Sequence, residues 1–168
     1  MQAFDRSFLR LNRWAVIALL AAMAVMVFAN VVLRALTAHS ILWVEEASRY
    51  TMIWLTFIGA GPVLRYGGHI GIESLHERVP RVAPYLRALI VALLFGFFAF
   101  MIWVGMRYAV LTWGQTTAVL EIPIGAVYLA IPAGFALLTV HLALMAAPYI
   151  RARTLLGDGE FDADAAKL

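Results

Sequence analysis

The sequence contains no cysteine and few charged residues. Without cysteine, the chain can form no disulfide framework, no thiolate metal site and no thiol nucleophile. Charged residues make up 14% of the 168 positions and hydrophobic residues 64%, against about 25% and roughly 45–50% in ordinary soluble domains. A soluble fold of this length could not bury so much apolar surface. The composition therefore predicts an all-α integral membrane protein.

Motifs of enzymes and of self-contained transporters are also missing. The sequence has no Gly-rich phosphate loop, no nucleophile elbow and no paired carboxylates flanking a cleft, so we expect no catalytic residue, cofactor or metal. No internal repeat is evident, whereas a secondary transporter that works alone uses repeated halves and broken helices around a midplane site. These absences predict a membrane protein that works through a partner.

Four apolar segments are long enough to cross a bilayer. The uncharged run from Trp14 to Leu33 covers twenty residues, which at about 1.5 Å per residue span the ~30 Å hydrocarbon core, and its one strongly polar member is Asn30. This run is longer than the ~7–15 residues of a signal-peptide core, so we expect a retained anchor. In the last segment Pro132 predicts a kink, because proline lacks an N–H. The predicted spans of a single domain, residues 1–150, are 14–36, 43–64, 87–110 and 124–148.

Basic residues lie on alternate connections between these spans. They precede the first span, separate the second from the third, and follow the fourth, so the positive-inside rule predicts a multi-pass membrane protein with both termini and the central loop in the cytoplasm. These residues are Arg6, Arg10, Arg13, Arg65, Arg78, Arg81, Arg87, Arg151, Arg153 and Lys167. Since they mark topology, we expect membrane lipids but no nucleic acid among the partners.

The central loop and the C-terminal tail have different patterns. In the loop, Ile72, Leu75 and Val79 recur at helical spacing, which predicts a short amphipathic helix over residues 70–79 at the cytoplasmic interface. The tail, residues 151–168, is acidic and punctuated by glycine, and we expect a disordered cytoplasmic segment there.

The histidines do not indicate a cofactor site. His69, Glu73 and His76 have i, i+4, i+7 spacing and could face one metal ion, but the chain supplies no cleft or nearby general base, so a polar surface helix is the favoured interpretation. His141 is alone in the fourth span, whereas a haem held by two histidines would need a second at similar depth. We therefore interpret His141 as an interior residue that makes hydrogen bonds.

Charged residues interrupt the start of the second span, in the stretch ILWVEEASRY. Glu45 and Arg49 are i and i+4 with the acid first, which predicts an ion pair, and both Glu45 and Glu46 lie where the helix dipole favours anions. Arg34 could join them, and Trp43 suits an aromatic belt. The cluster is either an interfacial anchor or a buried polar joint between helices or with a partner subunit. Because exposed pairs contribute only ~0–1 kcal/mol, the number of charges favours the joint.

Two segments carry a more specific pattern. The first is WVEEASRYTMIWLTFIGAGPVLRYGGHIGIESL, preceded by Arg34; its matching residues are Arg34, Trp43, Glu45, Glu46, Arg49, Trp54, Gly59, Arg65, His69, Ile70 and Leu75. The second is GQTTAVLEIPIGAVYLAIPAG; its matching residues are Gly114, Gln115, Leu120, Pro123, Tyr128, Pro132 and Gly134. Through both, the sequence resembles the small membrane subunit (DctQ-like) of tripartite ATP-independent periplasmic (TRAP) transporters. It departs from that pattern where Thr117 and Ala118 replace a frequent Ser-Pro and Ala126 a frequent Trp.

The resemblance implies a complex of three proteins for sodium-coupled uptake of an organic acid. A DctP-like periplasmic binding protein captures the substrate, and a DctM-like large permease subunit carries the substrate and sodium sites and moves as an elevator. The small subunit braces that elevator and helps the binding protein to dock. The residues implied for partner contact or structure are Arg34, Trp43, Glu45, Glu46, Arg49, Trp54, Arg65 and His69.

Two alternatives remain beside this interpretation. A small four-helix exporter would normally place an essential carboxylate in the middle of a span, and the predicted spans contain none there. A membrane-anchor subunit of a respiratory enzyme would need paired intramembrane histidines or a quinone pocket, and only His141 is available.

Overall fold

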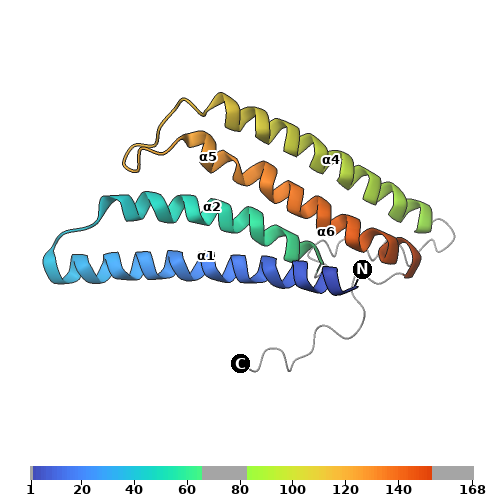
Figure 1. Cartoon of the computed structure of the whole chain (residues 1–168), viewed down its shortest axis with the longest axis horizontal. Coiled ribbons are helices and arrows are strands. Elements are labelled where there is room, and N and C mark those ends of the chain that lie inside the picture. The colour runs from blue at the N-terminus through green and yellow to red at the C-terminus, as the bar shows by residue number, and fades with distance from the viewer. Residues whose placement is uncertain (1, 66–82, 153–168) are drawn as a thin grey trace, which may run out of the picture.

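A computed structural model describes residues 2–65 and 83–152 of the chain (Figure 1). Over these residues the backbone is helical apart from the connections 38–41 and 112–123 and a break at Leu129. The helices are α1 (Gln2–Thr37), α2 (Leu42–Arg65), α4 (Ala83–Leu111), α5 (Ile124–Tyr128) and α6 (Ala130–Ala152). No strand occurs within the described ranges, in agreement with the predicted all-α fold.

The helix boundaries differ from the predicted spans most clearly at the start of the first span and at the end of the last one. The first helix begins at Gln2, well before the predicted start at residue 14, because a helix needs only its backbone hydrogen bonds and can continue through a charged segment outside the lipid. At the other end, α6 continues to Ala152, so Arg151 and Ala152 are helical although they were expected in the disordered tail. The predicted helix at residues 70–79, His69 and the remaining tail lie outside the described residues.

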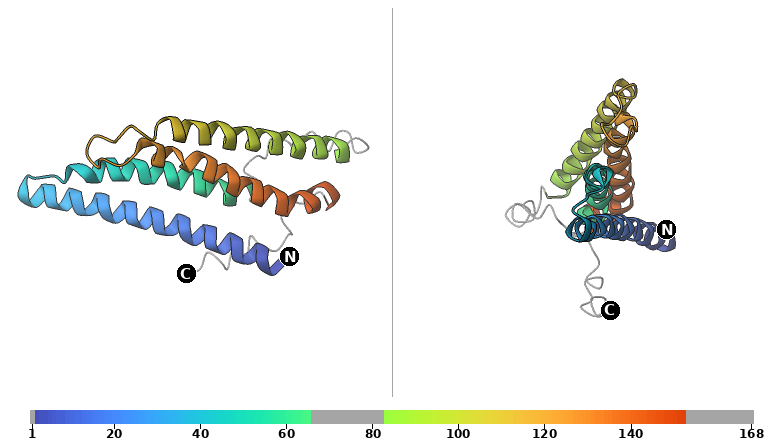
Figure 2. Two further views of the ribbon diagram at one scale, coloured as in Figure 1. Left: turned by 45° about the horizontal axis from the view of Figure 1, so that its top comes forward. Right: turned by 90° about the vertical axis from the view of Figure 1, so that its left-hand side faces the viewer.

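The long helices lie side by side in the order α1, α2, α6, α4 (Figures 1 and 2). The most extensive helix contacts are between α4 and α6, α1 and α2, and α2 and α6. The turn 38–41 and the loop 112–123 lie at one end, while the start of α1, the end of α2, the start of α4 and the end of α6 lie at the other. This alternation is what a chain that crosses a membrane repeatedly requires.

Three segments are long and apolar enough to cross a membrane: Asp5–Thr37, Tyr85–Leu111 and Ile124–Ala146. They coincide with the first, third and fourth predicted spans. Helix α2 is also long, but its first turns carry Glu45, Glu46 and Arg49, and it is not among the three. Its crossing of the membrane therefore stays a prediction.

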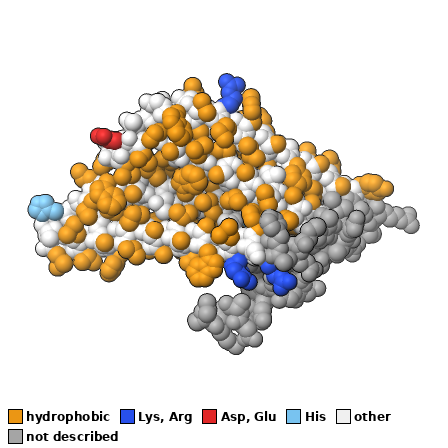
Figure 3. All heavy atoms as spheres, in the orientation of Figure 1, with side chains coloured by type: hydrophobic (Ala, Val, Ile, Leu, Met, Phe, Trp, Pro, Cys, Tyr) orange, Lys and Arg blue, Asp and Glu red, His pale blue; other side chains and the backbone are white. Residues whose placement is uncertain are grey.

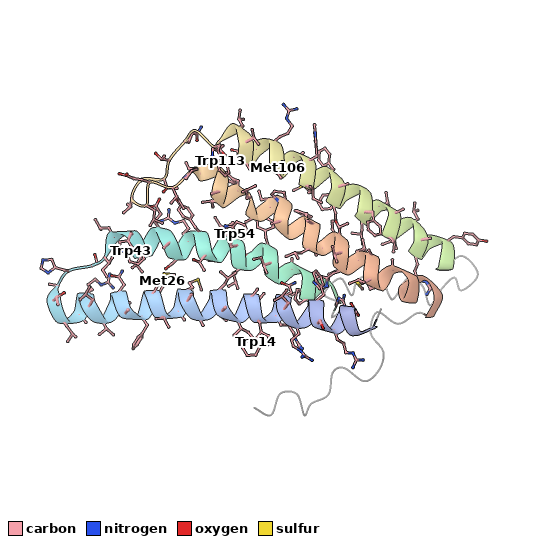
Figure 4. All side chains as sticks on the ribbon, viewed as in Figure 1. Trp14, Met26, Trp43, Trp54, Met106 and Trp113 are labelled. Carbon is pink, nitrogen blue, oxygen red and sulfur yellow. The ribbon has the colours of Figure 1, made fainter. Side chains whose placement is uncertain are left out.

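Large hydrophobic side chains cover the outward surfaces of the helices (Figure 3). On α1 they include Trp14, which projects away from α2 (Figure 4), and Phe28. On α4 they include Leu93, Phe100 and Trp103. Such surfaces are stable in lipid or against a partner but not in water.

Glycine residues allow the central helices to approach closely. A Cβ at Gly134 of α6 would lie 2.6 Å from Phe57 Cβ and 2.8 Å from Phe57 O of α2, so no side chain fits there. A Cβ at Gly105 of α4 would lie 2.9 Å from Pro132 Cδ of α6. Between these contacts, Phe135 packs its ring edge-on against that of Phe97, with centroids 5.7 Å apart. Small residues and aromatic packing therefore join α2, α6 and α4.

The last apolar segment is interrupted where the sequence predicted an irregularity. Helix α5 ends at Tyr128 and α6 begins at Ala130, with Leu129 between them. Pro132 has no N–H to donate to the carbonyl of Tyr128, and its ring crowds the preceding turn. The backbone bonds from Leu129 N to Gly125 O (3.0 Å) and from Ala133 N to Leu129 O (3.1 Å) keep the two helices continuous in direction across the break.

Candidate functional site

Helix α2 buries one charged side chain near each end. Glu46 is 7% exposed and so is Arg65. The two residues are nineteen positions apart, and at about 1.5 Å per residue their Cα atoms are about 28 Å apart along the helix, close to the ~30 Å of a hydrocarbon core. Buried charges are costly unless they are paired or hydrogen-bonded, so each residue indicates a built polar contact.

The Glu46 cluster consists of Glu46, Tyr50, Thr117, Val119 and Leu120. The Tyr50 hydroxyl donates to Glu46 Oε1 at 2.7 Å, and the backbone amides of Val119 and Leu120 donate to Oε2 at 2.9 and 2.8 Å. Hydrogen bonds to a carboxylate are stronger than those between neutral groups. Glu46 thereby fastens the loop 112–123 to the first turns of α2.

The loop itself is closed by its own hydrogen bonds. Thr117 is buried; its N–H donates to Ile122 O at 2.9 Å, and Ile122 N–H donates to the Thr117 hydroxyl at 3.3 Å. The N–H of Ile124 donates to Gln115 O at 2.8 Å, and Glu121 adopts a left-handed conformation with φ 54°. A threonine carries a hydroxyl as a serine does, so having Thr117 where the resemblance implied a serine still provides the acceptor for Ile122.

The other charged residues at this end are placed differently. Glu45, Arg49 and Arg34 are exposed, and the ion pairs of the described residues do not include the predicted one between Glu45 and Arg49. An exposed pair of this spacing contributes only about 0.3–0.5 kcal/mol, so there is little to hold the two side chains together. Tyr50, four residues after Glu46 on α2, is the helix neighbour that contacts Glu46. Tyr50 was not predicted as a site residue, although its i+4 spacing from Glu46 could have indicated the contact.

The tryptophans of the motif lie on the same helix. Trp43 is exposed at the end of α2 that faces the loop, and Trp113 lies at that end too (Figure 4). Trp54, one of the expected partner-contact residues, is half-buried farther along α2. The turn before α2 is held by Asn30, whose Oδ1 accepts a hydrogen bond from Ile41 N–H at 2.8 Å.

The Arg65 cluster consists of Asp5, Asn12, Arg65 and His141. Arg65 Nε donates to His141 Nδ1 at 2.7 Å, and its terminal nitrogen forms an ion pair with Asp5. The side-chain amide of Asn12 lies 3.0 Å from His141 Nε2. Three helices, α1, α2 and α6, therefore meet in one polar network at the end of the molecule opposite the loop.

His141 is the centre of this network and is fully buried, with none of its surface exposed. The ring of Phe8 lies 4.8 Å away between centroids. The prediction that His141 is an interior hydrogen-bonding residue is confirmed. Asp5 and Asn12 were missed; their seven-residue spacing places them on one face of α1, which is a signal that the sequence does contain.

The geometry suits structural support better than catalysis or metal binding. Within the described residues, no three His, Cys, Asp or Glu side chains are grouped so that they could hold a metal ion. The candidate set of His69, Glu73 and His76 falls outside the residues that the structure describes. What the described clusters do is to join helices and to fasten one loop.

Comparison with known proteins relates the chain to one family. The family model of the DctQ component of tripartite ATP-independent periplasmic transporters matches residues 23–151. This range contains the Glu46 cluster together with Arg65 and His141.

Individual relatives agree with this match. The chain is 41% identical over 64 residues to a TRAP transporter small permease protein of Haemophilus influenzae, covering 38% of the chain and 40% of the relative. It is 33% identical over 69 residues to the C4-dicarboxylate TRAP transporter small permease protein DctQ of Vibrio cholerae, covering 41% and 30%. It is 26% identical over 108 residues to the isethionate TRAP transporter permease protein DctMQ of Oleidesulfovibrio alaskensis, covering 62% and 17%. The matched segments thus span less than half of each of these relatives.

Proposed function

The chain belongs to the DctQ family of small permease subunits of tripartite ATP-independent periplasmic (TRAP) transporters, and we propose that it braces a DctM-like large permease subunit and helps a DctP-like periplasmic binding protein to dock. The transported substrate in this proposal is an organic acid, and its uptake is coupled to sodium through sites on the large subunit. The protein has four spans in the bacterial inner membrane, α2 among them, with both termini in the cytoplasm.

The Glu46 cluster is the main support for the proposed bracing role. A buried carboxylate that accepts two successive backbone amides and a tyrosine hydroxyl gives the loop 112–123 a fixed position on α2. Fixed geometry is what a subunit needs if its surfaces are to support a moving partner.

Two further observations support the proposed partners. The relative from Oleidesulfovibrio alaskensis is a permease protein whose name, DctMQ, combines the two membrane components. In this chain, Arg34, Trp43, Glu45 and Arg49 are exposed at the end of the molecule that holds the Glu46 cluster. Their exposure leaves them available for contact with another subunit, as the resemblance implied.

The alternatives fit the described residues less well. Both ring nitrogens of His141 are engaged, one by Arg65 and one by Asn12, so this histidine is not positioned to bind a haem iron. The acidic residues of the described helices, Asp5, Glu45 and Glu46, lie near helix ends, whereas an exporter would place a carboxylate at mid-span.

Reconstitution tests this function directly. The chain alone in proteoliposomes should give no sodium-dependent uptake of any organic acid, and uptake should appear only with the large subunit and the binding protein. Arg49→Ala should reduce co-purification with the large subunit and reduce uptake, because it removes an exposed charge from the proposed contact. Lys167→Ala, which removes a charge from the C-terminal tail of the sequence, serves as the control. Uptake by the chain alone would refute the proposal, and unaltered co-purification and transport by Arg49→Ala would remove Arg49 from the interface.

A further inference from the structure

The hydrogen bond from Arg65 determines which ring nitrogen of His141 carries a proton. An arginine side chain has only N–H donors and no acceptor. Since Arg65 Nε lies 2.7 Å from His141 Nδ1, that nitrogen must accept and therefore keeps its lone pair. The ring is then neutral, with its hydrogen on Nε2.

This assignment conflicts with the amide of Asn12 as it is oriented. Asn12 Nδ2 lies 3.0 Å from His141 Nε2, so two donors face each other, while Asn12 Oδ1 is buried with no hydrogen-bond partner. The oxygen and nitrogen of a side-chain amide are assigned from the hydrogen bonds that they make. Rotating the Asn12 amide by half a turn places Oδ1, an acceptor, opposite the Nε2–H donor of His141.

We propose that Asn12 is a positioning residue whose Oδ1 accepts the Nε2–H of His141, completing a one-directional chain of hydrogen bonds from Arg65 through His141 to Asn12. The chain fixes the tautomer and orientation of the buried imidazole. Its first donor, Arg65 of α2, is also ion-paired with Asp5 of α1, and its last acceptor, Asn12, lies on α1 too. Asp5 and Asn12 thereby hold α1 to α2 and to α6 through a single histidine.

Gly61 makes this connection possible. Helix α2 lies between α1 and α6 (Figure 1), and α1 and α6 are not among the helix pairs in extensive contact. A Cβ at Gly61 would lie 2.4 Å from His141 Cδ2 and 3.0 Å from Asn12 Nδ2. Because Gly61 has no side chain, Asn12 and His141 can meet across α2, and the polar chain joins α1 to α6 directly in addition to their packing on α2.

Nuclear magnetic resonance of the imidazole nitrogens tests the assignment on the unaltered protein. The full chain, with ¹⁵N-labelled histidine, is placed in lipid nanodiscs, and the His141 signals are identified by their loss in His141→Gln. We expect a protonated Nε2 and an unprotonated Nδ1. A proton on Nδ1, or on both nitrogens, overturns the proposal.

A pair of asparagine variants tests the positioning role. Because the chain has no cysteine, spin labels can be attached at Leu11→Cys on α1 and Val140→Cys on α6, both of which are exposed positions. Asn12→Leu should broaden the distance distribution between the labels and shift the resonance of His141 Nε2, which loses its acceptor, while the hydrogen bond from Arg65 keeps the proton on Nε2. Asn30→Leu removes the part-buried hydrogen bond between the other asparagine of α1 and Ile41 at the opposite end of the helix, and it should change neither measurement. An unchanged Nε2 resonance and an unchanged distance distribution in Asn12→Leu would refute the positioning role, and the spectrum of the unaltered protein decides the assignment even if this variant does not fold.

Discussion

At the residue scale, two adjacent glutamates with the same chemistry have different environments. Glu45 is exposed, whereas Glu46 is buried and accepts three hydrogen bonds from Tyr50, Val119 and Leu120. Neighbouring residues on a helix point about 100° apart, so only one of the two can face the loop. The polar joint expected at the start of α2 is therefore centred on Glu46 and not on a Glu45–Arg49 ion pair.

Removing the Glu46 carboxylate should release the loop. Glu46→Ala leaves one hydroxyl and two backbone amides, all in part-buried hydrogen bonds, without their acceptor, and a hydrogen bond to a charged group contributes roughly 1.5–3 kcal/mol. We expect amide hydrogen exchange at Val119 and Leu120 to accelerate roughly 100-fold in nanodiscs. The control Glu45→Ala should change these rates less than about two-fold, since exposed substitutions stay within ~0.5 kcal/mol. Equal protection in both variants would show that the cluster does not hold the loop.

At the element scale, helix packing depends on where glycine is present. Gly134 faces the backbone of Phe57 with no room for a Cβ, whereas Gly96 of α4 has no atom within 4 Å of the position a Cβ would take. Both residues lie inside helices, where glycine is about 1 kcal/mol less favourable than alanine. At Gly134 the close packing of α2 against α6 requires glycine despite its low helix propensity. At Gly96 no packing contact among the described residues requires glycine.

Alanine at these two glycines should have opposite effects. Gly134→Ala forces α2 and α6 apart and should destabilise the protein by about 1–3 kcal/mol, as overpacked sites do. Gly96→Ala should raise stability by roughly 0.5–1 kcal/mol, because it improves helix propensity without a clash. The thermal midpoints of the two variants in the same detergent measure the difference. A midpoint for Gly134→Ala at or above that of the parent would contradict the close α2–α6 contact.

At the scale of the whole molecule, the helices form a row whose outer members have little of their surface covered. None of the most apolar window of the α1 span is buried within the chain, against 17% for that of α4 and 39% for the segment containing α6. The surfaces of α1 and α4 are therefore in contact with lipid or with a partner subunit when the protein is in a membrane. Both outer sides of the row are therefore available for contact with a larger protein subunit.

The arrangement of the ends predicts a definite topology. The turn 38–41 and the loop 112–123 share one end of the molecule, and the positive-inside rule assigns that end to the periplasm. Reporter fusions at Ser40 and Thr117 should therefore report the periplasm, while fusions at Gly68 and after Leu156 should report the cytoplasm. A periplasmic signal at Leu156 would refute the topology with four spans.

Much of the fold follows from composition and periodicity. Uncharged runs located three membrane-capable helices, because such runs depend on local sequence alone. The kink predicted at Pro132 stays a prediction, although the helix is interrupted nearby, at Leu129. The start of α1 at Gln2 could not be obtained from the uncharged run, since a helix continues past the edge of the lipid. The expected ion pair of Glu45 with Arg49 rested on spacing, which permits such a contact but does not require it.

The sequence by itself determined that this is a helical membrane protein with a DctQ-like motif and a histidine suited to interior hydrogen bonding. Only the tertiary structure decided which partners the polar residues take. Glu46 meets amides more than seventy positions away at Val119 and Leu120, and Arg65 meets Asp5 and His141 from two other helices. Local patterns indicate which face of a helix a residue occupies, but they do not indicate which helix packs against that face. The tertiary structure decides this, because α6 lies between α2 and α4 and because Gly61 has no side chain to separate Asn12 from His141.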